Sequence, residues 1–183
     1  MADIIKLITD LCALLLLFRM LLQFVQADFF NPLSQMVLKL TAPVVEPLHK
    51  ILPTIGTLNT AALMGAILSK WLFYWILLVT GNPLYLGIGT HFMTATFEVL
   101  NLLIEIYFWG IVIIALASWL DAFHHPHVQL VGEIVEPYLR PFRRVIPPIG
   151  MLDISSMVAI ITLLIIQARL LPLIKSMLLQ IIT

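Results

Sequence analysis

Six ionisable side chains lie inside long apolar runs of this 183-residue chain: Asp10, Arg19, Lys70, Glu98, Glu105 and Arg169. Glu98, Asn101 and Glu105 stand at positions i, i+3 and i+7, so they share one face of a helix. A charge inside a membrane helix is costly and marks either an ion pathway or a structural pair. One interpretation of this stripe, taken with Lys70, is a path for a cation or a proton. The other, which the cost of an unpaired charge favours, is a set of ion pairs that fix the register of the helices.

The rise of a helix predicts which of these charges meet. Counted from the expected outer ends of their segments, Lys70 and Glu105 lie at similar depths, and so do Arg169 and Glu98. We therefore predict a Lys70–Glu105 pair and an Arg169–Glu98 pair.

Other chemistry finds little support in the residues. His124, His125 and His127 form a short cluster, but no further ligand lies nearby to complete a metal site. Cys12 is the one cysteine, and the chain holds no phosphate-binding loop, nucleophile elbow or dinucleotide fingerprint. We expect no metal, no cofactor and no enzymatic reaction.

The composition points to a membrane protein. Hydrophobic residues make up 61% of the chain and charged residues only 11%, whereas soluble domains have about 45–50% and about 25%. Lys and Arg number ten, as do Asp and Glu, so the chain has no formal net charge and we expect no nucleic-acid partner.

The apolar residues fall into four segments that are long enough to cross a bilayer. Because a backbone in hydrocarbon must satisfy its own hydrogen bonds, the fold is predicted to be an all-α membrane protein with about four transmembrane helices. Pro172 should end or kink the last segment, which leaves 173–182 as its tail or as an interfacial piece. The four segments are residues 4–25, 58–79, 92–120 and 154–171.

The chain contains an internal repeat. Residues 40–59 align with 134–153 at a constant offset of 94, with prolines and glycines in matching places. This predicts two parallel repeats, each a span, an amphipathic interfacial segment and a second span, in 1–80 and 92–183, joined by an outward-facing linker over 81–91. The matched pairs are Pro43 with Pro137, Pro47 with Pro141, Pro53 with Pro147, Gly56 with Gly150, and Asn59 with Asp153.

Each repeat segment should fold as short helices that lie in the membrane surface. The prolines are expected to break each segment into two, and Gly56 and Gly150 should turn the chain towards the next span. Asn59 and Asp153 are suited to cap that span. Arg19, near the inner end of the first span, is expected to reach the interface or to meet Asp153.

The basic residues of the two segments predict the orientation. By the positive-inside rule both segments face the cytoplasm, and the linker and both termini face the periplasm. The same residues could dock anionic lipid or a partner protein, although setting the topology is by itself enough to explain them. They are Lys39, Lys50, Arg140, Arg143 and Arg144.

The stretch Glu136-Pro-Tyr-Leu-Arg-Pro-Phe-Arg-Arg-Val-Ile-Pro-Pro-Ile-Gly-Met-Leu-Asp-Ile-Ser155 resembles the signature of the YggT (YlmG) family of small membrane proteins, and the chain resembles its two-copy members. The first copy departs from the pattern at His49 and Lys50. The resemblance implies a non-enzymatic protein of the bacterial inner membrane, involved in osmotic-stress tolerance, ion homeostasis or the assembly of membrane complexes. The expected partners are the lipid bilayer, an unidentified membrane protein and a second copy of the chain. The alternative is a small transporter or channel component that uses Glu98, Asn101 and Glu105 with Lys70.

Overall fold

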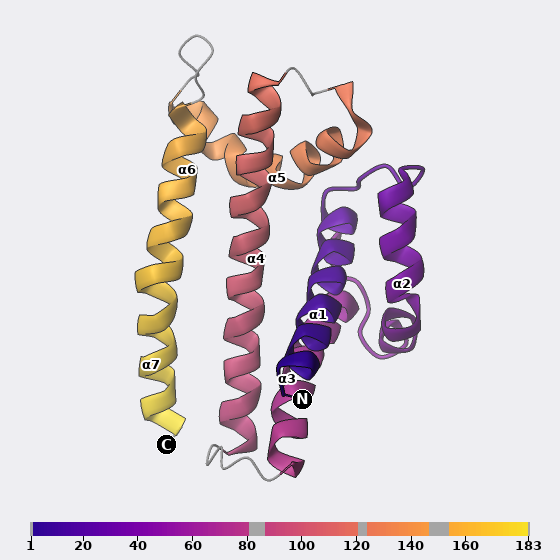
Figure 1. Cartoon of the computed structure of the whole chain (residues 1–183), viewed down its shortest axis with the longest axis vertical. Coiled ribbons are helices and arrows are strands. Elements are labelled where there is room, and N and C mark those ends of the chain that lie inside the picture. The colour runs from indigo at the N-terminus through magenta and orange to yellow at the C-terminus, as the bar shows by residue number, and fades with distance from the viewer. Residues whose placement is uncertain (1, 81–86, 121–123, 147–153, 183) are drawn as a thin grey trace.

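The computed structural model describes residues 2–80, 87–120, 124–146 and 154–182 (Figure 1). These residues hold no β-strand, and a single β-bridge joins Ile55 to Leu58. The all-α prediction is therefore confirmed for this part of the chain. The helices are α1 (Ala2–Phe24), α2 (Pro32–His49), α3 (Thr60–Val79), α4 (Ile88–Trp119), α5 (Pro126–Val145), α6 (Ile154–Ile165), the π-helical turn η2 (Ile166–Leu170) and α7 (Leu171–Ile182).

Three helical stretches are long and apolar enough to cross a membrane: Thr60–Val79, Ile88–Ser118 and Ile154–Gln180. They support the prediction of a membrane protein. The first predicted span, now α1, is not among them, and its role as a fourth span stays a prediction.

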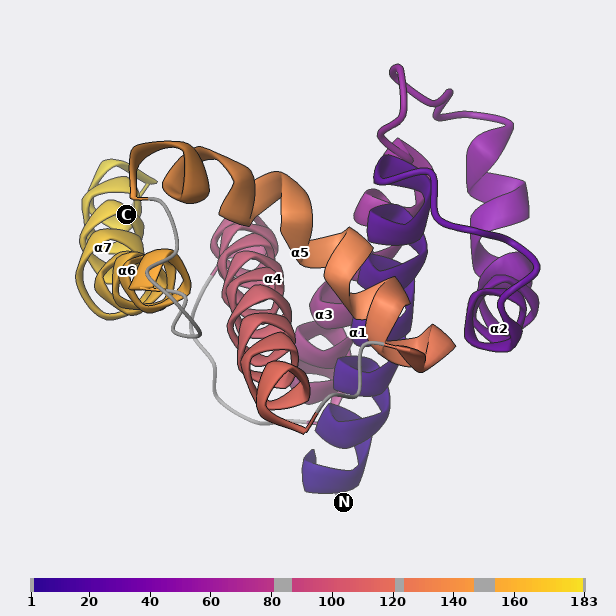
Figure 2. The same cartoon turned by 90° about the horizontal axis from the view of Figure 1, so that it is seen from above.

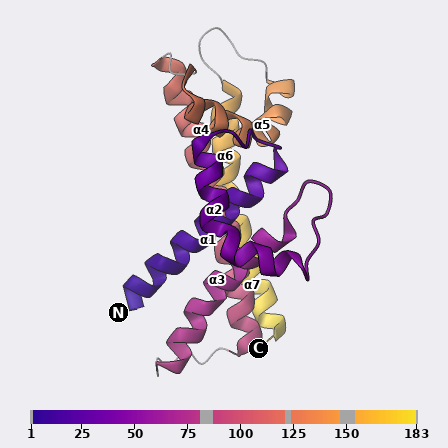
Figure 3. The same ribbon diagram turned by 90° about the vertical axis from the view of Figure 1, so that its right-hand side faces the viewer.

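The long helices alternate in direction (Figures 1 and 3). α4 stands beside the column formed by α6 and α7, and α1 packs along α3 at an inclination to that pair. α3 contacts α4 and so joins the two halves of the chain. In each half the first long helix contacts both the following segment and the last helix.

The ends of α2 and α3 form as their residue types predict. The side chain of Asn31 accepts a hydrogen bond of 3.0 Å from the backbone N–H of Leu33, with Pro32 in the first turn. Asn59 does the same for Ala62 at 2.9 Å. Gly56 turns the chain with a φ of +61°, which a glycine adopts without strain. The matching Pro147, Gly150 and Asp153 lie outside the described residues.

The prediction that prolines break each repeat segment into two helices is wrong. α2 continues through Pro43 and Pro47, and α5 continues through Pro137 and Pro141. In each helix the two prolines are four residues apart and exposed, so the lost N–H groups and the carbonyls that they leave unbonded lie on one outward face. The helix can then bend away from that face without ending, and Figure 2 shows α5 as a curved ribbon.

The two segments differ in how they lie. α5 crosses the side of the upper part of α4, whereas the first part of α2 runs along the outside of α1 (Figures 1 and 2). Gly110 lets α5 approach α4, since a Cβ atom there would lie only 2.6 Å from Cγ1 of Val135.

Residues 173–182 belong to the last helical column. Pro172 lacks the N–H that would bond to the carbonyl of Ala168, and the π-helical turn η2 contains that carbonyl. The wider turn absorbs the proline, so α6, η2 and α7 follow one another without a break.

Candidate functional site

Three helices bring charged side chains together inside the bundle. The Nζ atom of Lys70 on α3 lies 2.5 Å from Oδ1 of Asp10 on α1 and 3.5 Å from Oε2 of Glu98 on α4. The hydroxyl of Tyr74 donates a short hydrogen bond to the other oxygen of Glu98. We call Asp10, Lys70, Tyr74 and Glu98 the charge cluster.

The helical register explains why the cluster forms. Lys70 and Tyr74 are four residues apart and so stand on one face of α3. α1 packs along that helix and presents Asp10 on one side of Lys70, while α4 presents Glu98 on the other. The ammonium group is thus held between two carboxylates that come from separate helices.

The charge cluster lies deep along α3. Lys70 is ten residues from Thr60 and nine from Val79, which places it roughly 15 Å from each end of the helix. Its side chain is 8% exposed, whereas the side chains of Asp10 and Glu98 are 37% and 30% exposed. If α3 spans the bilayer, the ammonium lies near the middle of the hydrocarbon core.

The charges of the cluster do not balance. One ammonium faces two carboxylates, so a single negative charge is left over when all three groups are ionised. In a medium of low dielectric constant such an excess is expensive, and binding one proton or one cation removes it. The arrangement is therefore suited to taking up a single positive charge.

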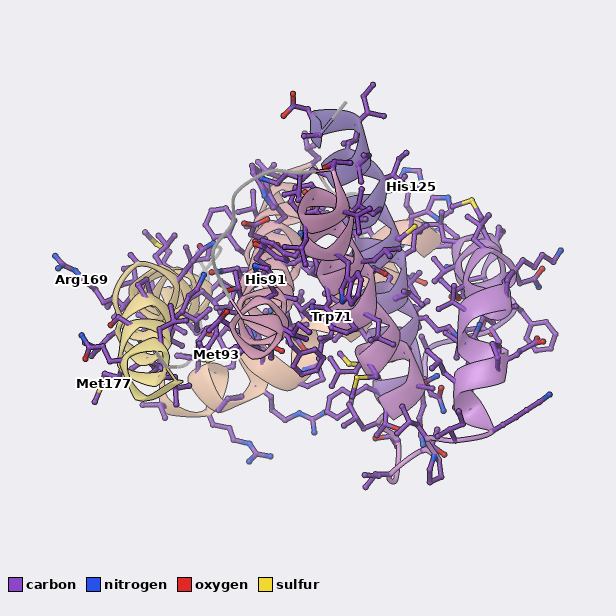
Figure 4. All side chains as sticks on the ribbon, turned by 90° about the horizontal axis from the view of Figure 1, so that it is seen from below. Trp71, His91, Met93, His125, Arg169 and Met177 are labelled. Carbon is purple, nitrogen blue, oxygen red and sulfur yellow. The ribbon has the colours of Figure 1, made fainter. Side chains whose placement is uncertain are left out.

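His91 extends the cluster along α4. Its ring stacks on that of Tyr74, with centroids 5.5 Å apart and planes 10° apart. The residue is 2% exposed, and Nε2 has no hydrogen-bond partner within the described residues. Figure 4 shows His91 and Trp71 in the crowded region where α3 and α4 meet.

The sequence prediction does not include His91 because the predicted third span begins at residue 92, one residue after it, whereas α4 begins at Ile88. The signal was nevertheless present, since His91, Thr94 and Glu98 continue the stripe of Asn101 and Glu105 at helical spacing. Asp10 was recognised as an ionisable residue in an apolar run but was given no partner.

The predicted Lys70–Glu105 pair is wrong. Glu105 is exposed and accepts a hydrogen bond of 3.4 Å from Nε2 of Gln167. α4 begins at Ile88, earlier than expected, so Glu98 lies ten residues from its start and matches the depth of Lys70 below Val79. Equal depth is a sound rule here, but the predicted span starts at residue 92, four residues too late.

The predicted Arg169–Glu98 pair is also wrong. Glu98 is engaged by Lys70 and Tyr74, whereas Arg169 lies on the π-helical turn η2 and is exposed. Figure 4 shows its side chain at the outer edge of the molecule, directed away from α4. The additional residue in a π turn changes the faces that later side chains occupy, so counting along a regular helix fails there.

Arg19 holds α2 against α1. One of its terminal nitrogens donates to the carbonyl of Leu38 and to Oγ1 of Thr41, both at 3.1 Å. Its Nε has no partner within the described residues. The alternative partner, Asp153, lies outside them.

The basic residues of α5 are partly neutralised by a neighbouring acid. Arg143 lies 2.8 Å from a carboxylate oxygen of Glu136, and Arg140 lies 3.8 Å from the other. Arg144 is exposed, as are Lys39 and Lys50 in the first half of the chain. A docking surface for anionic lipid would thus have fewer unpaired charges than the sequence suggested.

Tyr138 ties α5 to α6. Its hydroxyl donates a hydrogen bond of 3.0 Å to the carbonyl of Ala159, and burial raises the pKa of Tyr138 above its usual value of 10.0.

Metal binding finds no support in the described residues, where no group of three or more His, Cys, Asp or Glu side chains converges. Two carboxylates beside an ammonium supply too few ligands for a hard divalent ion, which takes about six oxygens.

A family model and several relatives match most of the chain. The family model described as CCB3/YggT matches residues 1–80 and 93–174. An uncharacterized protein of Pseudomonas aeruginosa is 34% identical over 165 residues, which cover 87% of this chain and 82% of the relative. The uncharacterized protein YggT of Escherichia coli K12 is 31% identical over 162 residues, covering 87% and 83%. An uncharacterized protein of Vibrio alginolyticus is 34% identical over 170 residues, covering 89% of each. No solved structure matches.

Proposed function

This chain belongs to the CCB3/YggT family, and from that premise we propose that it is a non-enzymatic inner-membrane protein that contributes to ion homeostasis and osmotic-stress tolerance. In this proposal it exchanges one positive charge at the cluster of Asp10, Lys70 and Glu98. The observation that carries the proposal is the excess negative charge of the cluster at mid-depth of an apolar helix. A purely structural pair would need only one carboxylate for Lys70.

The proposed arrangement in the membrane follows the repeat. We infer four spans in two parallel repeats, α1 to α3 and α4 to α7, with α2 and α5 towards the cytoplasm and both termini in the periplasm. Two observations support the repeat: the family model matches two separate stretches, and equivalent helices contact one another within each half. On this orientation, the end of the bundle where α3 ends and α4 begins faces the periplasm.

Ion flux tests the proposal. The purified protein is reconstituted into liposomes, and the decay of an imposed proton or sodium gradient is followed with a pH-sensitive or a sodium-sensitive dye. We expect the wild-type protein to speed the decay of one gradient and Glu98→Gln to reduce that rate at least tenfold. Glu105→Gln is the matched control, because Glu105 lies on the same helix but outside the cluster. Equal rates for Glu98→Gln and the wild-type protein would show that the cluster moves no charge.

A second candidate function is the docking of anionic lipid on α5. The observation in its favour is that α5 crosses the upper part of α4 with Arg140 and Arg144 exposed. Native mass spectrometry should then detect fewer anionic lipids bound to Arg140→Ala/Arg144→Ala than to the wild-type protein. Retention of the same lipids by the double variant would leave topology as the role of these residues.

A further inference from the structure

We propose that the charge taken up is a proton and that His91 accepts it, at the end of the bundle where α4 begins, before it reaches Glu98. This inference rests on the proposed function, because it names the ion and its route to the same cluster. Four observations lead to it: the order of polar groups along α3 and α4, the apolar packing on the other side of the cluster, the buried unpaired nitrogen of His91 and the small number of oxygen ligands.

Three polar side chains follow one another from the first turn of α4 towards the cluster: His91, Tyr74 and Glu98. His91 is the fourth residue of α4, and Glu98 lies seven residues, or about 10 Å, further along the same helix. Tyr74 bridges this interval from α3, since its ring stacks on His91 and its hydroxyl donates to Glu98. His91, Tyr74 and Glu98 are therefore successive titratable side chains between the first turn of α4 and the cluster, the first two in ring contact and the last two joined by a hydrogen bond.

The opposite direction is closed by apolar side chains. One and two turns further towards the start of α3 lie Ala66 and Ala62, both fully buried. Leu17 and Ala13 on α1 are also fully buried and belong to the same core. Polar side chains thus follow α3 and α4 from the cluster towards the end of the bundle where His91 is buried, and a packed core lies towards the start of α3.

His91 has the features of a proton acceptor. A buried polar atom without a partner is uncommon in folded proteins, and Nε2 of His91 has none among the residues that the structure describes. An imidazole nitrogen can bind a proton, and the ring of His91 is held in place by its stacking on Tyr74. The unpaired nitrogen is therefore available to take a proton.

The helices packed around His91 carry several charged and titratable side chains. α3 contributes Tyr74 and, one turn away, Lys70; α4 itself contributes Glu98; α1 contributes Asp10 through Lys70. α7 also packs along α4 and carries Lys175, for which no ion pair occurs in the described part of the chain. A proton on His91 makes the set of His91, Lys70, Asp10 and Glu98 neutral, because two cations then face two carboxylates.

The proposed step moves one proton from His91 to Glu98. The imidazole binds one proton and becomes an imidazolium, then releases it and returns to the neutral ring. A carboxylate oxygen of Glu98 receives that proton and becomes a neutral acid, so Lys70 is left with Asp10 as its single counter-ion. No bond between heavy atoms forms or breaks. A metal ion would instead need about six oxygen ligands at once, and the cluster offers the carboxylates of Asp10 and Glu98 and the hydroxyl of Tyr74 beside an ammonium group.

Proton uptake into proteoliposomes, measured with a trapped pH dye, tests the route. We expect His91→Gln to slow uptake at least tenfold, because glutamine cannot take up a proton near neutral pH. His125→Gln serves as the control histidine, since His125 is exposed and precedes α5. Labelling with a hydrophobic carbodiimide, which reacts with protonated carboxyls, reports separately on Glu98 and should persist in His91→Gln under prolonged incubation at pH 5.

A second variant keeps the test decisive if His91→Gln does not fold. Tyr74→Phe keeps the stacking ring but removes the hydroxyl that donates to Glu98, and we expect it also to slow uptake at least tenfold. Uptake at the wild-type rate in either folded variant, with Glu98→Gln inactive, would overturn the route while the proposed function stands. Sodium flux without proton flux in the wild-type protein would overturn the choice of ion. No flux of either ion would remove the proposed function as well.

Discussion

At the scale of single residues, the charged side chains within the long helices contact polar groups of neighbouring helices. Lys70 has a carboxylate on each side, Arg19 binds a carbonyl and a hydroxyl of α2, and Tyr74 donates to Glu98. Each contact joins two helices, so the same groups that could carry a charge also fix the positions of the helices. Stability and ion flux must therefore be measured separately for every variant.

Lys70→Met is expected to lower the free energy of unfolding by about 1–3 kcal/mol, because it leaves two partly buried carboxylates without their counter-ion. Reversible unfolding in SDS, followed by circular dichroism, measures this loss. The double variant Lys70→Met/Asp10→Asn should recover part of it, because it removes one of the unpaired charges. Lys39→Met, at an exposed site on α2, is the control. If the single and double variants are equally stable, Lys70 and Asp10 do not stabilise each other.

At the scale of helices, glycine and proline decide how the segments lie. Gly110 brings α5 close to α4, and paired prolines bend α2 and α5 without ending them. Tyr138 fastens α5 to α6 with one hydrogen bond. α5 is thus held at two places, on α4 and on α6.

Gly110→Ala should destabilise the protein by about 1–3 kcal/mol, because the new methyl group would lie 2.6 Å from Cγ1 of the buried Val135. Gly89→Ala is the matched control on the same helix, since a Cβ atom there meets nothing within 4 Å. Unfolding in SDS compares the two variants. Adding Val135→Ala to Gly110→Ala should relieve the clash, and a double variant that shows only additive losses would contradict it.

Tyr138→Phe is expected to cost about 1 kcal/mol at neutral pH through the lost bond to Ala159. Because burial raises the pKa of Tyr138 in the folded state, the phenol stabilises the fold fully below pH 10.0. That contribution is lost as the pH rises through the raised pKa. The wild-type protein should therefore melt at a higher temperature than the variant at pH 8, and this difference should shrink as the pH rises above 10. A constant difference would show that the hydroxyl does not titrate with folding.

At the scale of the whole molecule, the charge cluster lies where the two halves of the chain meet. Asp10 and Lys70 come from the first half and Glu98 from the second, and α3 and α4 pack together there. Neither half contains the complete cluster, so its assembly depends on the packing of α1 and α3 against α4. The orientation of the bundle then decides from which side a proton arrives.

The proposed topology predicts opposite accessibility for the two ends of the bundle. In a Cys12→Ser background, Thr80→Cys at the end of α3 should react with a membrane-impermeant maleimide in intact spheroplasts. Arg144→Cys on α5 should react only after the membrane is opened. Both positions are exposed in the folded chain, so protection reflects the membrane. The reverse pattern would invert the orientation and make the route from His91 begin in the cytoplasm.

The sequence by itself determined the properties that depend on local chemistry. The length and composition of the apolar runs indicated a helical membrane protein, and the proline–arginine stretch of 136–155 indicated the family. The caps at Asn31 and Asn59 and the turn at Gly56 were also predictable, because each depends on residues only a few positions away.

Only the tertiary structure decided which charges meet. The partner of Lys70 depends on the relative heights of α1, α3 and α4, and an error of four residues in the start of α4 exchanged Glu98 for Glu105. Whether prolines break or bend a helix depends on which face they occupy in the packed molecule, and α2 and α5 bend. The position of His91 against Tyr74 is likewise a contact between helices. Pairing energies fall steeply with distance, so a shift of one helical turn, too small to alter the apolar pattern, is enough to change every partner.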